Sequence, residues 1–169
     1  MDKKLRLINY ISIAVILLAA GLLAIPQFIL NVNYEVLGNI NGYQFFFHAV
    51  DTKYETLSGM NGVSGLGIAS IVLMVLSLAA FIFARKSSAL SMLGGLLNVV
   101  TAVLFFMMEV SKKHVYGSHR SFVAVGWPAY VIGGLLVLAG LIAIYYSFRS
   151  MQQEKKQIAS KQSYSYLKK

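Results

Sequence analysis

The residues best suited to chemistry in this sequence are three histidines and one acid. His48, His114 and His119, together with Glu109, carry the imidazole and carboxylate groups that zinc commonly binds. Their spacing contains no HxxxH or other short ligand pattern, so the sequence predicts no metal site. The 169 residues include no cysteine, which excludes disulfides, thiolate metal sites and cysteine redox relays.

Glu109 lies where the apolar run "FFMMEV" meets Lys112 and Lys113. An acid in this setting is typical of a residue at the level of the lipid headgroups rather than of a general acid. No nucleophile and base pair, phosphate-binding loop or cofactor motif accompanies it. We therefore expect a protein without catalytic activity and without a cofactor.

The elements that position these residues are four long apolar stretches in a chain that is 57% hydrophobic and only 12% charged. They cover residues 7–30, 62–84, 89–110 and 128–148. Each is long enough to cross about 30 Å of hydrocarbon as a helix. The runs are apolar on all sides, unlike the striped helices of a soluble core. The sequence predicts an all-α membrane protein, a four-transmembrane-helix bundle over residues 1–149 with a basic tail at 150–169.

The first stretch begins like a signal peptide. Basic residues precede the apolar run, and Ala19, Ala20 and Gly21 offer a small-residue cleavage site. The apolar run continues beyond that site, so we interpret it as an uncleaved signal anchor, with a removed signal as the alternative.

Basic residues are distributed unequally between the two sides of this arrangement. One side holds Lys3, Lys4, Arg6, Arg85, Lys86, Arg149, Lys155, Lys156, Lys161, Lys168 and Lys169; the other holds Lys53, Lys112, Lys113 and Arg120. Because cytoplasmic segments are enriched in lysine and arginine, we expect both termini and the turn at 85–88 in the cytoplasm. The loops at 31–61 and 111–127 then lie outside, and the plasma membrane is the expected location.

The net charge of +9 does not indicate nucleic acid binding. The basic residues flank the apolar runs instead of forming a folded basic face. Anionic lipids at the cytoplasmic surface are the expected partners.

Five residues are predicted to mediate helix packing: Gly94, Gly95, Asn98, Gly133 and Gly134. Glycines let helix backbones approach closely, and a buried amide tends to pair with a neighbouring helix. The glycines suit packing inside the bundle, with a homodimer face as the alternative.

The first outer loop contains a turn signal between two segments rich in aromatic and branched residues. Residues 38–42 include Asn-Gly, and residues 34–37 and 43–50 flank them, which predicts a small β-hairpin. A strand through Tyr43, Phe45, Phe46 and Phe47 would leave aromatic area exposed. This area either binds a partner or lies among the lipid headgroups.

The predicted layout has a longer first and a shorter second outer loop, with both termini inside. It is similar to that of animal tetraspan proteins such as claudins and tetraspanins. Their outer-loop cysteines and the claudin Trp–Gly-Leu-Trp signature are absent here, and a shared layout does not specify a function.

We expect an accessory, assembly or protective subunit that binds another membrane protein or an envelope ligand through the outer loops. The expected partner is another membrane protein or further copies of the chain in a homo-oligomer. The alternative is a small oligomeric channel or exporter. The spans place no ionisable residue near their centres, whereas proton-coupled carriers generally need one. Small multidrug exporters have a similar helix count but depend on a membrane-embedded acid that the first stretch lacks.

Overall fold

The computed structural model describes residues 3–32, 35–47, 64–84, 87–110 and 123–166. Their elements, in chain order, are α1 (Lys3–Leu22), β1 (Pro26–Val32), β2 (Glu35–Asn41), α2 (Gly42–Phe47), α3 (Gly65–Phe83), α4 (Ser88–Phe106), β3 (Val123–Val125) and α6 (Trp127–Tyr166).

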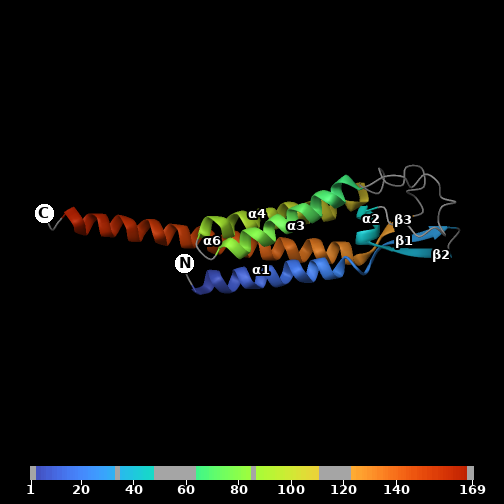
Figure 1. Cartoon of the computed structure of the whole chain (residues 1–169), viewed down its shortest axis with the longest axis horizontal. Coiled ribbons are helices and arrows are strands. Elements are labelled where there is room, and N and C mark those ends of the chain that lie inside the picture. The colour runs from blue at the N-terminus through green and yellow to red at the C-terminus, as the bar shows by residue number, and fades with distance from the viewer. Residues whose placement is uncertain (1–2, 33–34, 48–63, 85–86, 111–122, 167–169) are drawn as a thin grey trace.

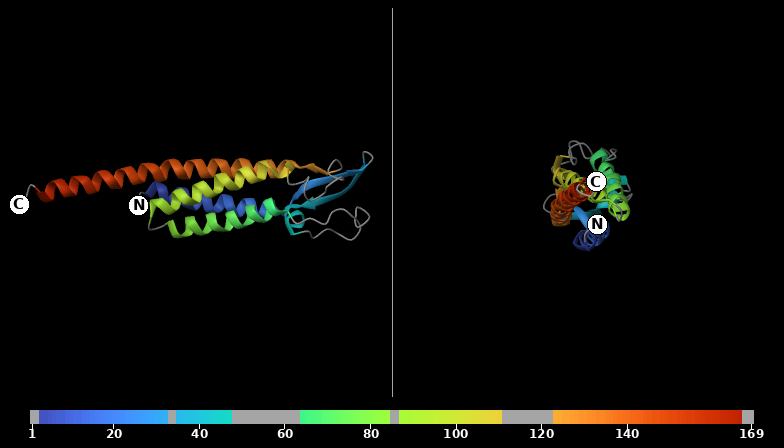
Figure 2. Two further views of the ribbon diagram at one scale, coloured as in Figure 1. Left: turned by 90° about the horizontal axis from the view of Figure 1, so that it is seen from above. Right: turned by 90° about the vertical axis from the view of Figure 1, so that its left-hand side faces the viewer.

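The four long helices form an antiparallel bundle (Figure 1). Each helix packs on two neighbours, so that α1, α3, α4 and α6 form a closed ring in which α4 and α6 make the most extensive pair. The start of α1 and the far part of α6 lie at one end, here called the terminal end (Figures 1 and 2). The three strands and α2 lie at the opposite end, here called the sheet end.

All four long helices are long and apolar enough to cross a membrane, which makes the chain compatible with a multi-pass membrane protein. Up to residue 150, every serine, threonine and asparagine side chain within these helices is buried: Asn9, Ser12, Ser70, Ser77, Ser88, Ser91, Asn98, Thr101, Ser147 and Ser150. Large apolar side chains such as Leu17, Val75 and Leu138 face outwards. This pattern is the reverse of a water-soluble bundle, and it suits lipid surroundings. The helices are therefore not apolar on all sides, because a small and polar stripe faces inwards.

Aromatic residues on α6 mark the two ends of a membrane span. Trp127 is 64% exposed at the sheet end. Near the terminal end, Tyr145 and Tyr146 form an edge-to-face pair, and the Arg149 guanidinium lies 5.1 Å from the centre of the Tyr145 ring. Trp127 and Tyr146 are separated by about 28 Å at 1.5 Å per residue, close to the hydrocarbon thickness. The remainder of α6, to Tyr166, projects beyond the bundle (Figure 1).

The predicted first helix is too long. α1 ends at Leu22, and residues 26–30 belong to β1, so the expectation of a helix to residue 30 is wrong. Pro26 lacks the N–H that would continue a helix. The Gln27 side chain ends α1 by donating from Nε2 to the carbonyl oxygens of Leu22 (2.8 Å) and Ile25 (3.0 Å). The apolar residues that follow make a strand, because a short apolar run suits either structure and tertiary pairing decides.

The predicted hairpin over residues 34–50 is also wrong in its placement. β2 contains residues 38–41, which were expected to form the turn, and it pairs antiparallel with β1. β1 also pairs with β3, giving a three-stranded sheet in the order β2-β1-β3. Residues 42–47 are helical, and residues 48–50 of the expected strand lie outside the described residues. β1, which begins at Pro26, was not predicted. β2 pairs with β1 instead of with the strand that was expected at residues 43–50.

The boundaries of the second and third predicted helices differ from the observed ones by a few residues, whereas the fourth helix is much longer than predicted. α3 begins at Gly65, with the Ser64 hydroxyl accepting from the Gly67 N–H at 3.0 Å. Ser87 occupies the N-cap position of α4, and α4 ends at Phe106 rather than at residue 110. Pro128 lies in the first turn of α6, as expected. The fourth helix continues through most of the tail at 150–169.

α4 and α6 approach each other closely where they cross at Gly95 and Gly140. A Cβ atom on Gly95 would lie 2.8 Å from the Gly140 carbonyl oxygen, and one on Gly140 would lie 2.7 Å from the Gly95 carbonyl oxygen. Both distances are shorter than a carbon–oxygen contact allows, and the obstacle is backbone. Only glycine at both positions permits this crossing.

This contact predicts unequal effects for two glycine substitutions on the same helix. Gly140→Ala should lower the bundle's thermal stability, because α4 and α6 must move apart. Gly134→Ala should leave the stability unchanged or raise it by up to ~1 kcal/mol, because its Cβ meets nothing within 4 Å and alanine favours helix. Thermal unfolding in one detergent measures both. Equal melting temperatures for the two variants would contradict the proposed role of the crossing.

Candidate functional site

Among the described residues, no group of three or more His, Cys, Asp or Glu side chains could hold a metal ion. His48, His114 and His119 lie outside the described residues. Glu109 is exposed in the helical turn that follows α4 at the sheet end. The candidates for a functional site are therefore the polar interior of the bundle and the sheet end.

The best-defined polar contact inside the bundle joins α3 and α4. The Ser77 hydroxyl lies 2.7 Å from Asn98 Oδ1 and 2.9 Å from the Gly94 carbonyl oxygen. One hydroxyl proton serves only one acceptor, and Asn98 Nδ2 has no acceptor in this orientation. If the amide turns by 180°, Asn98 donates to Ser77 and Ser77 donates to Gly94. Asn98 then links two helices, and this contact does not present it to a solute.

A second polar contact crosses the bundle closer to the terminal end. The Ser91 hydroxyl on α4 donates to Asn9 Oδ1 on α1 at 2.6 Å. Asn9 Nδ2 and the Ser147 hydroxyl are buried without a partner. The antiparallel register, with Gly95 beside Gly140 and Ser88 bonded to Glu154, places Ser147 at about the level of Ser91. The buried polar groups that link helices or lack a partner thus lie from the middle of the bundle towards the terminal end, whereas Ser70 and Thr101, nearer the sheet end, donate to carbonyl oxygens of their own helices.

The predicted packing glycines occupy different environments. Gly94 faces the Phe81 ring, whose nearest atoms would lie 3.1 Å from a Cβ. Gly95 lies at the backbone crossing with α6, and Gly133 faces the Phe106 ring at 2.9 Å. Gly134 has nothing within 4 Å of its Cβ position. Gly140, which was not among the predicted residues, makes the tightest of these backbone contacts.

At the sheet end, α2 is held by a reciprocal pair of hydrogen bonds at its start. The Gln44 N–H donates to Asn41 Oδ1 at 2.8 Å, and the Asn41 N–H donates to Gln44 Oε1 at 3.0 Å. This is a capping box, with Asn and Gln in its two positions. The pattern Asn-x-x-Gln is visible in the sequence and could have revealed the helix. Instead, the Asn-Gly pair was interpreted as a hairpin turn.

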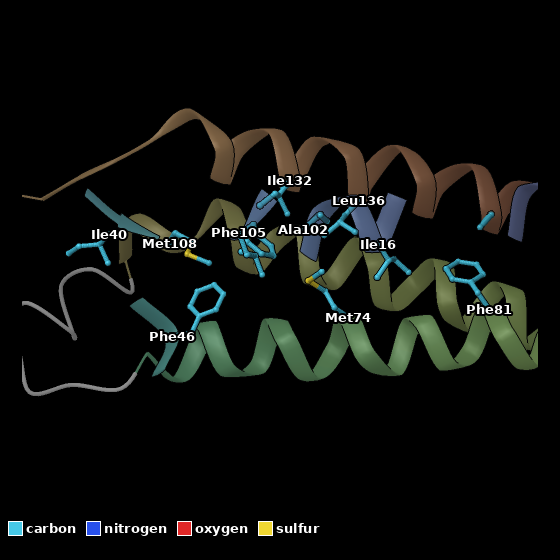
Figure 3. Packing of buried hydrophobic residues seen from close by; sticks show 13 residues of the cluster. Ile16, Ile40, Phe46, Met74, Phe81, Ala102, Phe105, Met108, Ile132 and Leu136 are labelled. Atoms are coloured by element: carbon cyan, nitrogen blue, oxygen red, sulfur yellow. The ribbon is translucent and has the colours of Figure 1, made fainter. Parts of the chain in front are cut away.

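The aromatic residues of α2 separate into an exposed and a buried group. Tyr43 is 39% exposed, and its hydroxyl donates to the Ala20 carbonyl oxygen on α1 at 2.7 Å. Phe46 is fully buried, with its ring 6.4 Å from that of Phe105 in an edge-to-face arrangement (Figure 3). The side chains of Phe45 and Phe47 lie outside the described residues.

The expectation of a strand through Phe46 is wrong, because residues 42–47 are helical, and Phe46 itself is buried. It packs over Gly67 of α3, so closely that a Cβ on Gly67 would overlap its ring. The helical turn of α2 directs the Phe46 ring towards the interior of the bundle. In a strand, successive side chains would instead have pointed to opposite faces. Phe46 is therefore an internal anchor for α2, and it is not available to bind a partner in this conformation.

The contacts of α2 define a small, fixed surface, here called the α2 platform: residues 42–47 with the capping residue Asn41. It is tied to α1 through Tyr43 and to α3 and α4 through Phe46. Such a platform can present side chains with little loss of conformational entropy on binding. It contains no arrangement that suggests bond-making chemistry.

The Phe46 anchor can be tested by substitutions at Gly67. Gly67→Ala should destabilise the chain by about 1–3 kcal/mol, because the added methyl group overpacks the Phe46 ring. Adding Phe46→Leu should recover part of the loss, giving a non-additive double-mutant cycle. Gly65→Ala is the matched control, since nothing lies within 4 Å of its Cβ. Equal stability of the two alanine variants in thermal unfolding would disprove the anchor.

The sequence matches no protein-family model, and no curated protein matches it. Function is therefore inferred from the contacts, burial and charges of the chain itself.

Proposed function

We propose that the chain is a non-catalytic accessory, assembly or protective subunit of the plasma membrane. It binds another membrane protein or an envelope ligand through the sheet end of the bundle. The terminal end faces the cytoplasm and contacts anionic lipid.

The observation that carries this proposal is the rigid attachment of the α2 platform. Tyr43 stays partly exposed while its hydroxyl is fixed to Ala20, and Phe46 fixes the same short helix to the core. An exposed aromatic residue held in one conformation is typical of a binding surface, because aromatic anchors often dominate interface energies.

The proposed alternative, a small oligomeric channel or exporter, is supported by the polar interior near the terminal end. Asn9, Asn98 and Ser147 each leave one buried polar atom without a partner. Against transport stands the sheet-end half, where Phe46, Phe105 and other buried apolar side chains fill the space between the helices (Figure 3). A polar path through a single chain would be interrupted there.

The proposed orientation is supported by the charges of the described residues. Every lysine and arginine in this part of the chain lies at the terminal end: Lys3, Lys4, Arg6, Arg149, Lys155, Lys156 and Lys161. Each contributes about 1 kcal/mol when it lies near an anionic lipid surface. The extension of α6 beyond Arg149 carries three of them into the cytoplasm in this orientation.

Cysteine accessibility tests the orientation. Ala124 on β3 and Ser160 on the α6 extension are both exposed and lie at opposite ends. In intact cells, Ala124→Cys should react with an impermeant thiol reagent, whereas Ser160→Cys should react only after the membrane is opened. The chain has no native cysteine to interfere. The opposite labelling pattern would reverse the proposed orientation.

Partner capture tests binding against transport. A variant with Tyr43→Ser, Phe45→Ser and Phe47→Ser should lose the partners that copurify and crosslink with the wild-type chain, because the proposed anchors are removed. Phe46 is left intact so that α2 stays attached. The matched variant Asn98→Leu should keep these partners, because its side chain is buried between α3 and α4.

Flux measurements on liposomes complete this test. The proposal predicts no ion or solute flux above that of empty liposomes. Robust flux that disappears with Asn98→Leu, together with unchanged capture by the triple variant, would favour the channel or exporter.

A further inference from the structure

An apolar groove lies where the helix ring is least tightly closed, between α1 and α3. These two helices make fewer contacts than any other neighbouring pair in the ring. The groove has a volume of about 200 Å³. Its walls include Ile16 and Ala20 of α1 with Leu23 just beyond it, Met74 and Val75 of α3, and Tyr43 of α2.

The groove is open towards the surroundings of the bundle. Ile16, Leu23 and Met74 form a buried floor, while Val75 and the adjoining Leu17 are 59% and 57% exposed at the rim. Apart from Leu23 and Tyr43, the lining residues belong to α1 and α3, two of the helices that are long and apolar enough to cross a membrane. Its mouth is thus continuous with the surface that faces hydrocarbon.

The dimensions of the groove restrict what can enter it. It follows α1 from Ile16 to Leu23, about 10 Å at 1.5 Å per residue. A helix of this length and 10–12 Å in diameter occupies roughly 800–1,200 Å³. The whole empty space of the groove, its open mouth included, is about 520 Å³. A second helix is therefore too large to enter it, whereas an extended hydrocarbon chain is small enough. An apolar cavity of about 150 Å³ already binds benzene, so the volume suffices for a stretch of such a chain.

We propose that this groove binds one acyl chain of a membrane phospholipid from the leaflet nearer the sheet end. Residues 16–23 form the part of α1 that approaches the sheet end, which places the groove in that leaflet. Tyr43 lines the groove at the sheet end, and the hydrogen bond from its hydroxyl to the Ala20 carbonyl oxygen fixes its ring there. The bound chain packs between α1 and α3 where the protein leaves them apart.

Photocrosslinking tests the site with a defined probe. The full chain is reconstituted in vesicles of phosphatidylethanolamine and phosphatidylglycerol that contain a phosphatidylglycerol with a diazirine on one acyl chain. Crosslinked peptides should come from residues 16–23 and 71–78 several-fold more often than from the lipid-facing surface around Val100 and Leu138. Labelling spread evenly over all lipid-facing helices would overturn the proposal.

Two substitutions on α3 supply a matched comparison. Val75→Trp fills the groove and should reduce its labelling to the level of the other surfaces. Val72→Trp adds the same side chain one turn away, at an exposed position that does not line the groove, and should leave the labelling unchanged. Equal labelling of both variants, or crosslinks between two copies of the chain at this site, would also overturn it. The wild-type map alone decides if Val75→Trp does not fold.

Discussion

The backbone crossing of Gly95 and Gly140 is the contact on which the arrangement of the bundle depends. It joins α4 and α6, the most extensive helix pair, and it fixes their antiparallel register. That register brings Ser88 of α4 to Glu154 of α6, and the other two helices pack along the sides of this pair. In lipid, burial of apolar area does not drive helices together, so close backbone approach and interhelical hydrogen bonds must do so.

Two kinds of contact meet this requirement inside the bundle. Small and polar side chains form hydrogen bonds between helices, as between Asn9 and Ser91 or between Ser77 and Asn98. Aromatic rings fill other parts of the interior, with Phe46 packed on Phe105 near the sheet end and Phe81 packed on Gly94 near the terminal end. A polar side chain inside a membrane bundle needs a hydrogen-bond partner within the protein, whereas an aromatic ring fills space without one.

The sheet end combines two features that the bundle alone could not provide. β1 leads the chain away from the end of α1, and the antiparallel β2 returns it to the bundle, where α2 lies against α1 and α3. Tyr43 belongs both to the α2 platform and to the wall of the lipid-facing groove. The proposed binding surface and the proposed acyl-chain site therefore share one fixed side chain. A lipid chain in the groove would lie directly against the α2 platform.

The sequence alone determined that the chain has four helices long and apolar enough to cross a membrane, because length and apolarity constrain helices in lipid regardless of their neighbours. Tertiary structure decided the rest. Residues 26–32 are apolar enough for a helix, yet strand pairing and the Gln27 cap make them β1. Asn41 and Gly42 fit a hairpin turn, yet the hydrogen bonds between Asn41 and Gln44 make the segment a helix, and the Phe46 ring packs against Gly67 in the interior. Such short segments carry weak local preferences, so the partner that they meet in space determines their structure.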